Sequence, residues 1–136
     1  MKRAERMVFA ARAMIGAPFR LHGRNPPTGL DCIGLALRVL EQAGHKRLGG
    51  GMIPAAYSVR GGTAEQFGKT MRAAGLRAVR RAKAGDLVLA QAGVAQFHLM
   101  IRTDAGHVHA DASLGKVAEM PGASPWPVIA YFRWGR

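Results

Sequence analysis

The chain has 136 residues, of which 49% are hydrophobic, and its 20 Lys and Arg against 8 Asp and Glu give a net charge of +12. This length predicts one domain, residues 1–136, with enough apolar side chains for a core, which excludes a wholly disordered chain. A single cysteine excludes an internal disulfide framework and a cysteine-rich zinc site. No apolar run reaches the roughly 18 residues of a membrane span.

The first predicted element is a helix at residues 2–15. Its apolar side chains recur at helical spacing on one face, namely Met7, Ala10, Ala11, Met14 and Ile15. Arg6 and Arg12 interrupt the apolar stretch, which a signal peptide would keep intact. We therefore expect this helix to belong to the mature fold, and we expect the protein to be made in the cytoplasm without a signal peptide.

A second helix is predicted at residues 32–43, after a loop rich in Gly and Pro at residues 16–31. Asp31 is a typical N-cap residue for this helix. Gly44 stands where helices commonly end in a left-handed conformation. Cys32 is therefore expected in the first turn.

Residues 44–62 are Gly-rich and predict an irregular surface loop, in which we expect His45 to be solvated. Thr63 then opens a third helix, because Gln66 follows it at the spacing of a capping box. Gly75 ends this helix.

After the third helix the apolar period changes to that of short strands. They are expected at residues 86–91, 96–102, 107–112, 116–120 and 128–134, separated by Gly, Asp or Pro. Consecutive strands that follow a group of helices indicate an α+β fold, with the helices packed on a mostly antiparallel sheet.

Cys32 combines a reactive side chain with a helix N-terminus. The partial positive charge and the unpaired backbone N–H groups of a helix N-terminus favour a thiolate and lower the pKa of a cysteine. The same N–H groups can hold the oxyanion of a tetrahedral intermediate. A small buried hydrophobic side chain without chemistry is the alternative for Cys32 taken alone.

A nucleophilic cysteine needs a base, and a predicted hairpin carries two histidines. If residues 103–106 form its turn, the numbers of paired residues sum to 209, and His98 faces Asp111. Strand alternation then puts His98, His109 and Asp111 on one face, with the two imidazoles within reach of a ring-to-ring hydrogen bond. This predicts a base with an orienting partner, and a zinc site of the same three residues stays open as an alternative.

Four segments, in this order, resemble the NlpC-type cell-wall peptidases, which are papain-like cysteine hydrolases. GAPFRLHG followed by TGLDCIGLA (16–36) resembles the Gly-x-Pro-Tyr loop and Asp-Cys-Ser-Gly of the family, and AKAGDLVLA (82–90) resembles its Pro-Gly-Asp-Leu segment. FHLMI (97–101) resembles its Gly-His-Val-x-Ile, and GHVHADA (106–112) resembles the segment that carries its third polar residue. The likeness runs from about residue 5 to residue 120 and departs from the pattern at Ile33, Phe97 and Phe19, the last standing where Tyr is common.

The resemblance implies a papain-like α+β fold, in which N-terminal helices pack on a mostly antiparallel sheet of about five to six strands. It implies that the protein hydrolyses an amide in peptidoglycan stem peptides, often the bond between D-glutamate and diaminopimelate, without a cofactor or metal. Cys32 would be the nucleophile and supply an oxyanion N–H, His98 the base, and His109 its orienter, with Asp111 as the alternative orienter. Candidate substrate contacts are Phe19, Arg20 and Arg24.

We expect a single domain without a signal peptide or accessory binding domains, and in this it resembles the members of the family found in phage tails and gene-transfer agents. We therefore expect phage-like tail proteins as partners and the periplasmic cell wall as the place of action. Two functions of other classes stay open. One is a tail-tip structural protein that keeps the fold without catalysis, and the other is a thiol amidase or acyltransferase with a substrate outside the wall.

The excess of positive charge favours polyanionic partners, namely nucleic acid, an anionic lipid surface or an acidic wall polymer, and a solvated basic surface without such a partner is the alternative. The densest basic cluster, RAVRRAKAGD (77–86), has no interleaved aromatic residues, and no nucleic-acid-binding motif accompanies it. We therefore do not expect a nucleic acid partner.

Overall fold

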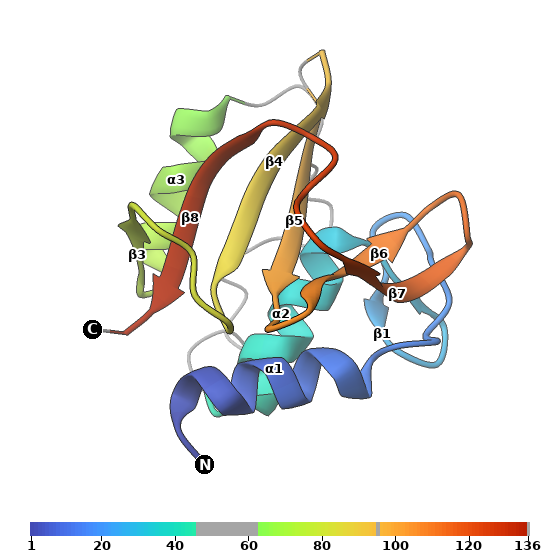
Figure 1. Ribbon diagram of the computed structural model, residues 1–136. Coiled ribbons are helices and arrows are strands. Elements are labelled where there is room, and N and C mark those ends of the chain that lie inside the picture. The colour runs from blue at the N-terminus through green and yellow to red at the C-terminus, as the bar shows by residue number, and fades with distance from the viewer. Residues whose placement is uncertain (46–62, 95, 136) are drawn as a thin grey trace.

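Helices pack against a six-stranded antiparallel sheet in the computed structural model, which describes residues 1–45, 63–94 and 96–135 (Figure 1). The helices are α1 (Arg3–Ala13), α2 (Cys32–Gln42) and α3 (Ala64–Ala73). Each lies where the sequence predicts it, with small differences at its ends. None of these helices has the length and apolar character that crossing a membrane would require.

The helix ends follow the predicted capping residues. The Asp31 side chain caps α2, and Thr63 and Gln66 form a reciprocal capping box at the start of α3. Gly44 and Gly75 follow α2 and α3 with φ values of 107° and 89°, a left-handed conformation that glycine adopts without steric cost.

The sheet has the strand order β3-β8-β4-β5-β6-β7. Its strands are β3 (Leu76–Val79), β4 (Leu87–Gly93), β5 (Gln96–Arg102), β6 (Gly106–Asp111), β7 (Lys116–Pro121) and β8 (Val128–Trp134). The five strands expected from the sequence are confirmed, and the α+β class with them. The sequence interpretation missed β3, whose four residues alternate too briefly between apolar and polar to be distinguished from a loop.

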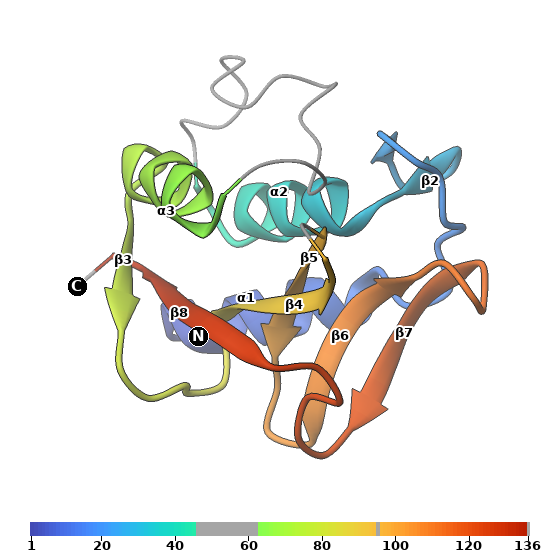
Figure 2. The same cartoon turned by 90° about the horizontal axis from the view of Figure 1, so that it is seen from above.

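The Gly- and Pro-rich loop before α2 also contains a small hairpin that the sequence did not predict. It consists of β1 (Arg24–Asn25) and β2 (Gly29–Leu30), with two residues in each strand. This hairpin lies next to the N-terminal end of α2 (Figure 2). It therefore shapes the surface in front of Cys32.

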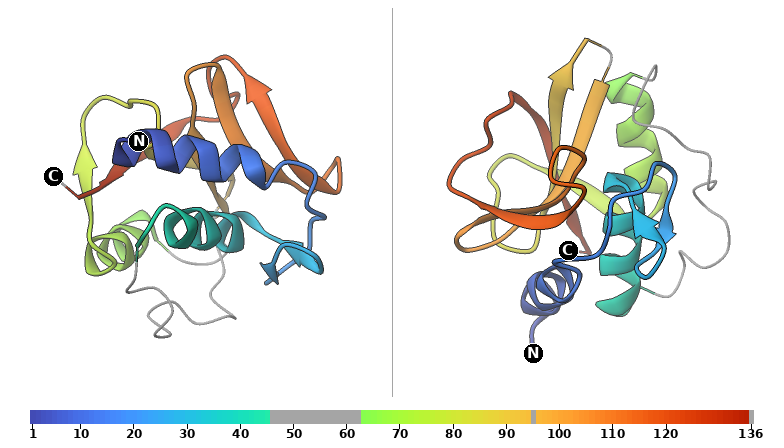
Figure 3. Two further views of the ribbon diagram at one scale, coloured as in Figure 1. Left: turned by 90° about the horizontal axis from the view of Figure 1, so that it is seen from below. Right: turned by 90° about the vertical axis from the view of Figure 1, so that its right-hand side faces the viewer.

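The main core lies between the sheet and the helices. Met7 of α1, Leu35 and Val39 of α2, and Leu99 and Ile101 of β5 are at most 1% exposed. Burying one such side chain contributes roughly 1.5–3 kcal/mol. α2 and α3 lie on one face of the sheet, and α1 runs along the end of α2 and β5 (Figure 3). This packing holds the N-terminus of α2 close to β5 and β6.

The β5–β6 hairpin has the register that the sequence predicts. Ile101 pairs with Val108 and Arg102 pairs with His107, so both pairs sum to 209. Within the turn, Thr103 Oγ1 accepts hydrogen bonds from the backbone N–H groups of the two residues before His107, at 3.2 and 2.9 Å. The turn thus fixes the register on which the predicted histidine pair depends.

The expectation for His45 is wrong. This residue is 5% exposed, its Nε2 lies 2.6 Å from the carbonyl oxygen of Ala74, and its ring packs 5.1 Å from that of Trp134. The last carbonyls of a helix lack partners within the helix, and His45 satisfies one of them at the end of α3. The rest of the predicted loop, residues 46–62, lies outside the described residues.

Candidate active site

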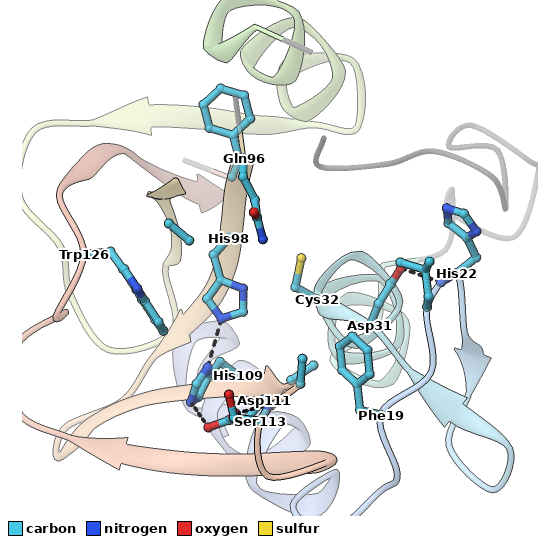
Figure 4. A pocket seen from close by; sticks show the side chains of 15 residues that line it. Phe19, His22, Asp31, Cys32, Gln96, His98, His109, Asp111, Ser113 and Trp126 are labelled. Carbon is cyan, nitrogen blue, oxygen red and sulfur yellow. Dashed lines mark hydrogen bonds and ion pairs between the residues drawn. The ribbon is translucent and has the colours of Figure 1, made fainter. Parts of the chain in front are cut away.

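A cavity of about 540 Å³ opens at the N-terminal end of α2. Its walls come from the loop before α2, from the first turn of α2, from β5 and β6, and from the loop between β7 and β8. Cys32, His98 and His109 all line it, and Figure 4 shows the Cys32 side chain across the cavity from the two imidazoles. The structure therefore brings together the three residues that the sequence singles out as catalytic candidates.

Asp31 anchors the loop in front of Cys32 to the helix. Its Oδ1 accepts hydrogen bonds from the backbone N–H of Gly34 at 2.8 Å and from Arg24 Nη1 at 2.9 Å. Its Oδ2 accepts from the backbone N–H of His22 at 2.9 Å. One carboxylate thus caps α2 and ties two points of the preceding loop to it, which fixes the position of Cys32.

The thiol of Cys32 is buried, and this outweighs the effect of the helix N-terminus. Cys32 is 5% exposed, and burial raises the pKa of its thiol to about 12. Hydrogen bonding to the backbone at Leu99, Cys32 and Ile33 lowers the pKa, while the charge of Asp31 raises it. The expected lowering of the cysteine pKa is therefore wrong, because desolvation penalises the charged form. The thiol is protonated at neutral pH.

The two histidines form a hydrogen-bonded pair. His98 Nε2 lies 2.9 Å from His109 Nδ1, and the ring planes meet at 86° with centroids 5.2 Å apart. On the far side, His109 Nε2 lies 3.7 Å from Asp111 Oδ2, and Figure 4 shows the row of three side chains. The sequence prediction of a ring-to-ring hydrogen bond is confirmed, and Asp111 contacts His109 rather than His98.

This row assigns the tautomers of both imidazoles. The carboxylate of Asp111 favours a proton on the facing Nε2 of His109, which leaves His109 Nδ1 as an acceptor. His98 Nε2–H then donates to His109 Nδ1, and His109 Nε2–H faces the carboxylate of Asp111. Each ring is thus held in the tautomer that leaves His98 Nδ1 free to accept a proton.

Both rings are neutral near pH 7. Burial lowers the pKa of His98 from 6.5 to about 4, with a further lowering by the charge of His109 and an opposing effect of Asp111. Burial also lowers the pKa of His109, and Asp111 again opposes this effect. The resting site therefore combines a neutral thiol with a neutral imidazole pair.

Trp126 covers both imidazoles and was missed by the sequence analysis. Its ring lies 5.0 Å from that of His98 and 6.0 Å from that of His109, in edge-to-face arrangements. Ser124 Oγ fixes this part of the loop, because it donates to the Trp126 carbonyl at 2.8 Å and accepts from the Trp126 N–H at 3.1 Å. A tryptophan between two prolines, in a loop that otherwise holds only Gly, Ala and Ser, was the signal available in the sequence.

Gln96 is a second residue that the sequence analysis missed. It precedes His98 by two positions on β5 and lines the same cavity. Figure 4 shows its amide directed toward the space between His98 and Cys32. Within the described residues, the Gln96 side chain has no hydrogen-bond partner, so its N–H groups are available to a ligand.

The three candidate substrate contacts occupy different places. Phe19 lines the cavity, and Figure 4 shows it among the side chains around Cys32. Arg20 is exposed and does not line the cavity. Arg24 forms an ion pair with Asp31 at 2.9 Å, which gives it a structural role in the loop. A contact of either arginine with substrate stays a prediction.

The zinc alternative has no support in the part of the chain that the structure describes. No group of three or more His, Cys, Asp or Glu side chains there is placed to hold a metal ion. His98 and His109 also direct nitrogens at each other, which removes these nitrogens from any common ligand sphere.

Two solved structures share this fold. The P60 domain of an antigen from M. avium subspecies paratuberculosis is 22% identical, with a TM-score of 0.62 over 97% of this chain and 93% of that one. The NlpC/p60 domain of the peptidoglycan hydrolase SagA is 26% identical, with a TM-score of 0.55 over 87% of this chain and 88% of that one. Neither a protein-family model nor a curated protein matches the chain. The α+β fold expected from the sequence resemblance is confirmed as that of NlpC/p60 domains.

Proposed function

We propose that this protein is a cysteine peptidase that hydrolyses amide bonds in peptidoglycan stem peptides, with the D-glutamyl–diaminopimelate bond as the expected target. The observation that carries the proposal is the position of Cys32, at the start of α2 and across one cavity from the hydrogen-bonded His98–His109 pair. The likeness to the domain of SagA, a peptidoglycan hydrolase, supports the substrate class.

The first half of the reaction uses the neutral resting pair. As Cys32 Sγ attacks the amide carbonyl carbon, the thiol proton moves to His98 Nδ1, so thiolate and imidazolium form together rather than in advance. His109 accepts the hydrogen bond from His98 Nε2, and Asp111 lies beyond His109 to stabilise the positive charge. The tetrahedral intermediate then collapses. The C–N bond breaks, His98 returns the proton to the leaving amine, and the substrate acyl group remains on Cys32 as a thioester.

The oxyanion of the intermediate needs donors that are already in place. The N–H of Cys32 belongs to the first turn of α2, where backbone N–H groups have no partners within the helix. The amide of Gln96 is the side-chain donor that faces the same space.

In the second half of the reaction a water molecule, activated by His98, attacks the thioester. The C–S bond then breaks, the carboxylate product is released, and the thiol of Cys32 is regenerated.

Digestion of purified sacculi tests this proposal. Wild-type protein should release soluble peptides, mass spectrometry of the new amino and carboxyl termini should identify the bond, and Cys32→Ala should release none. Arg38→Gln removes a partly exposed ion-pair partner on the same helix and should behave as wild type. A Cys32→Ala variant as active as wild type would contradict the proposal. A folded wild type without activity on sacculi would favour a tail-tip structural role or a thiol enzyme with another substrate.

The proposal includes delivery from the cytoplasm with a phage-like tail, followed by action on the periplasmic wall. Immunoblotting of purified tail particles tests this part, and particles that lack the protein would contradict it.

A further inference from the structure

The β3 edge of the sheet carries a concentration of positive charge that the candidate active site does not use. Between Glu65 and Asp104 the chain has seven Lys and Arg and one carboxylate, Asp86. Asp86 is 2% exposed, and Arg133 binds both of its oxygens at 2.8 Å. No exposed carboxylate in this stretch therefore offsets its exposed cations.

Four of these seven cations lie on β3 and the β3–β4 connection, and they share one surface with Arg3 of α1. Arg77 on β3 pairs in register with Arg133 on β8, and Arg133 Nη2 reaches the backbone carbonyl of Arg81 at 3.3 Å. Arg3 of α1 lies over the ring of Trp134 at 4.1 Å, and Trp134 ends the same strand, β8. The contacts thus connect α1, β3, β8 and the β3–β4 connection. We call the exposed cations on these elements the basic edge: Arg3, Arg77, Arg80, Arg81 and Lys83.

The basic edge also surrounds a hollow. A cavity of about 560 Å³ lies between α1 and the β3–β4 connection, and Arg3, Lys83, Arg133 and Trp134 line it. Arg133 is engaged by Asp86, whereas the Lys83 side chain has no ion-pair partner within the described residues. The hollow can therefore accept a small anionic group, such as a carboxylate, next to the Lys83 ammonium and the Arg3 guanidinium that lies over Trp134.

The cavity that holds Cys32 lacks such an excess of cations. Asp111 lines it, Asp31 in its wall is already paired with Arg24, and no Lys or Arg of the described residues lines it. The two sites also lie far apart in the sheet order, because β3 is at one edge while β6 and β7 are at the other (Figure 1). An anionic polymer is therefore attracted to the basic edge and not to the cavity that holds Cys32.

We propose that the basic edge is a second binding surface, which holds the carboxylate-rich stem-peptide network of the intact sacculus while the Cys32 cavity cleaves single stem peptides. This inference rests on the proposed function for its choice of polymer. A network that contacts both surfaces keeps the cavity at a high local concentration of stem peptides after each cleavage. A soluble fragment is too short to reach both surfaces and gains nothing from the basic edge.

The test compares two double variants that remove the same charge. Arg80→Gln/Arg81→Gln neutralises two exposed residues of the basic edge whose side chains make no interaction within the described residues. Lys69→Gln/Lys116→Gln is the matched control and removes two exposed cations from α3 and β7. Both carry the Cys32→Ala change for pelleting with sacculi freed of secondary polymers, so that binding is measured without digestion. Circular dichroism verifies that each variant is folded.

We expect the Arg80/Arg81 double variant to bind sacculi roughly three- to tenfold more weakly than the control at low salt, which is the range expected for two exposed ion contacts. The difference should vanish at about 1 M salt, where exposed charges separated by more than about 3 Å are largely screened from each other. With Cys32 intact, the same double variant should cleave sacculi more slowly but cleave a soluble muropeptide at the wild-type rate.

Equal binding by the two double variants would overturn the inference, and so would tighter binding of the wild type to DNA than to sacculi. An Arg80/Arg81 variant that aggregates but retains sacculus binding would also overturn it, because the charges would then protect the edge strand β3 from pairing. Failure of the proposed peptidase function would look different from failure of this inference. The wild type would then leave the soluble muropeptide uncut, whether or not it pellets with sacculi.

Discussion

Removing the indole of Trp126 should change the pH range in which His98 can act as a base. Trp126 covers His98 at 5.0 Å and His109 at 6.0 Å, and burial is the largest cause of the low pKa of His98, about 4 instead of 6.5. Trp126→Ala admits water to one side of both rings. The pKa of His98 should therefore rise by about 1, a substantial part of the displacement that burial causes.

The direction of the effect follows from which form of His98 is active. Only the neutral ring accepts the thiol proton, so activity should be lost on the acid side as pH falls through the pKa of His98. In the wild type this limb should lie near pH 4. In Trp126→Ala it should move up toward about pH 5, while Trp126→Phe, which retains an aromatic wall, should stay close to the wild type.

Two measurements check this prediction independently. The pH profile of kcat/KM reports the pKa of the base in the free enzyme, and NMR titration of the His98 ring reports the same pKa without any substrate. A folded Trp126→Ala variant whose NMR pKa remains near that of the wild type would refute the reasoning. It would mean that the ring of Trp126 does not exclude water from the imidazole pair.

The remaining predictions concern the other groups of the cavity. His98→Asn should lower kcat by roughly 10³–10⁴ because an amide cannot exchange the proton, whereas His109→Asn should retain clearly more activity than His109→Ala. Comparable losses for His109→Asn and His109→Ala would contradict an orienting role. Gln96→Glu should lower kcat by about 10²-fold with little change in KM, since it removes an oxyanion donor and preserves size. A change confined to KM would instead indicate ground-state binding. The free energy of unfolding should rise between about pH 4 and 6.5, because the unfolded chain binds the proton that folded His98 excludes. Chemical denaturation of wild type and His98→Phe should show a weaker rise in the variant.

Local sequence patterns predicted the elements that position the site. Asp31 followed by Cys32 places the thiol at the start of α2, and the turn at residues 103–106 sets the register that brings His98 to His109. Both features depend on near neighbours in the chain, so capping and strand alternation were sufficient to predict them. The antiparallel sheet likewise followed from strands joined by short connections.

The features that the sequence did not reveal depend on contacts between distant segments. Trp126 reaches His98 only because the β7–β8 loop folds over the outer side of β5. His45 is buried because the end of α3 and the ring of Trp134 come to it from elsewhere in the chain. Capping and periodicity are properties of one helix or strand at a time. They do not predict which distant segments pack against a side chain and exclude water from it.

The pKa of Cys32 is the clearest consequence of this difference, and it reverses a prediction from the sequence. A helix N-terminus alone predicts a thiolate and fast alkylation at pH 6.5. With burial raising the pKa of the thiol to about 12 and that of His98 lowered to about 4, no thiolate–imidazolium pair forms at rest. Alkylation by iodoacetamide should therefore be slower at pH 6.5 than for a model thiol, and it should keep rising through pH 9. His98→Ala should change this profile little, because the neutral imidazole does not ionise the thiol before substrate binds. A rate that reaches a plateau below pH 7 and falls in His98→Ala would show instead that the ion pair exists in the free enzyme, and that the helix N-terminus prevails over burial.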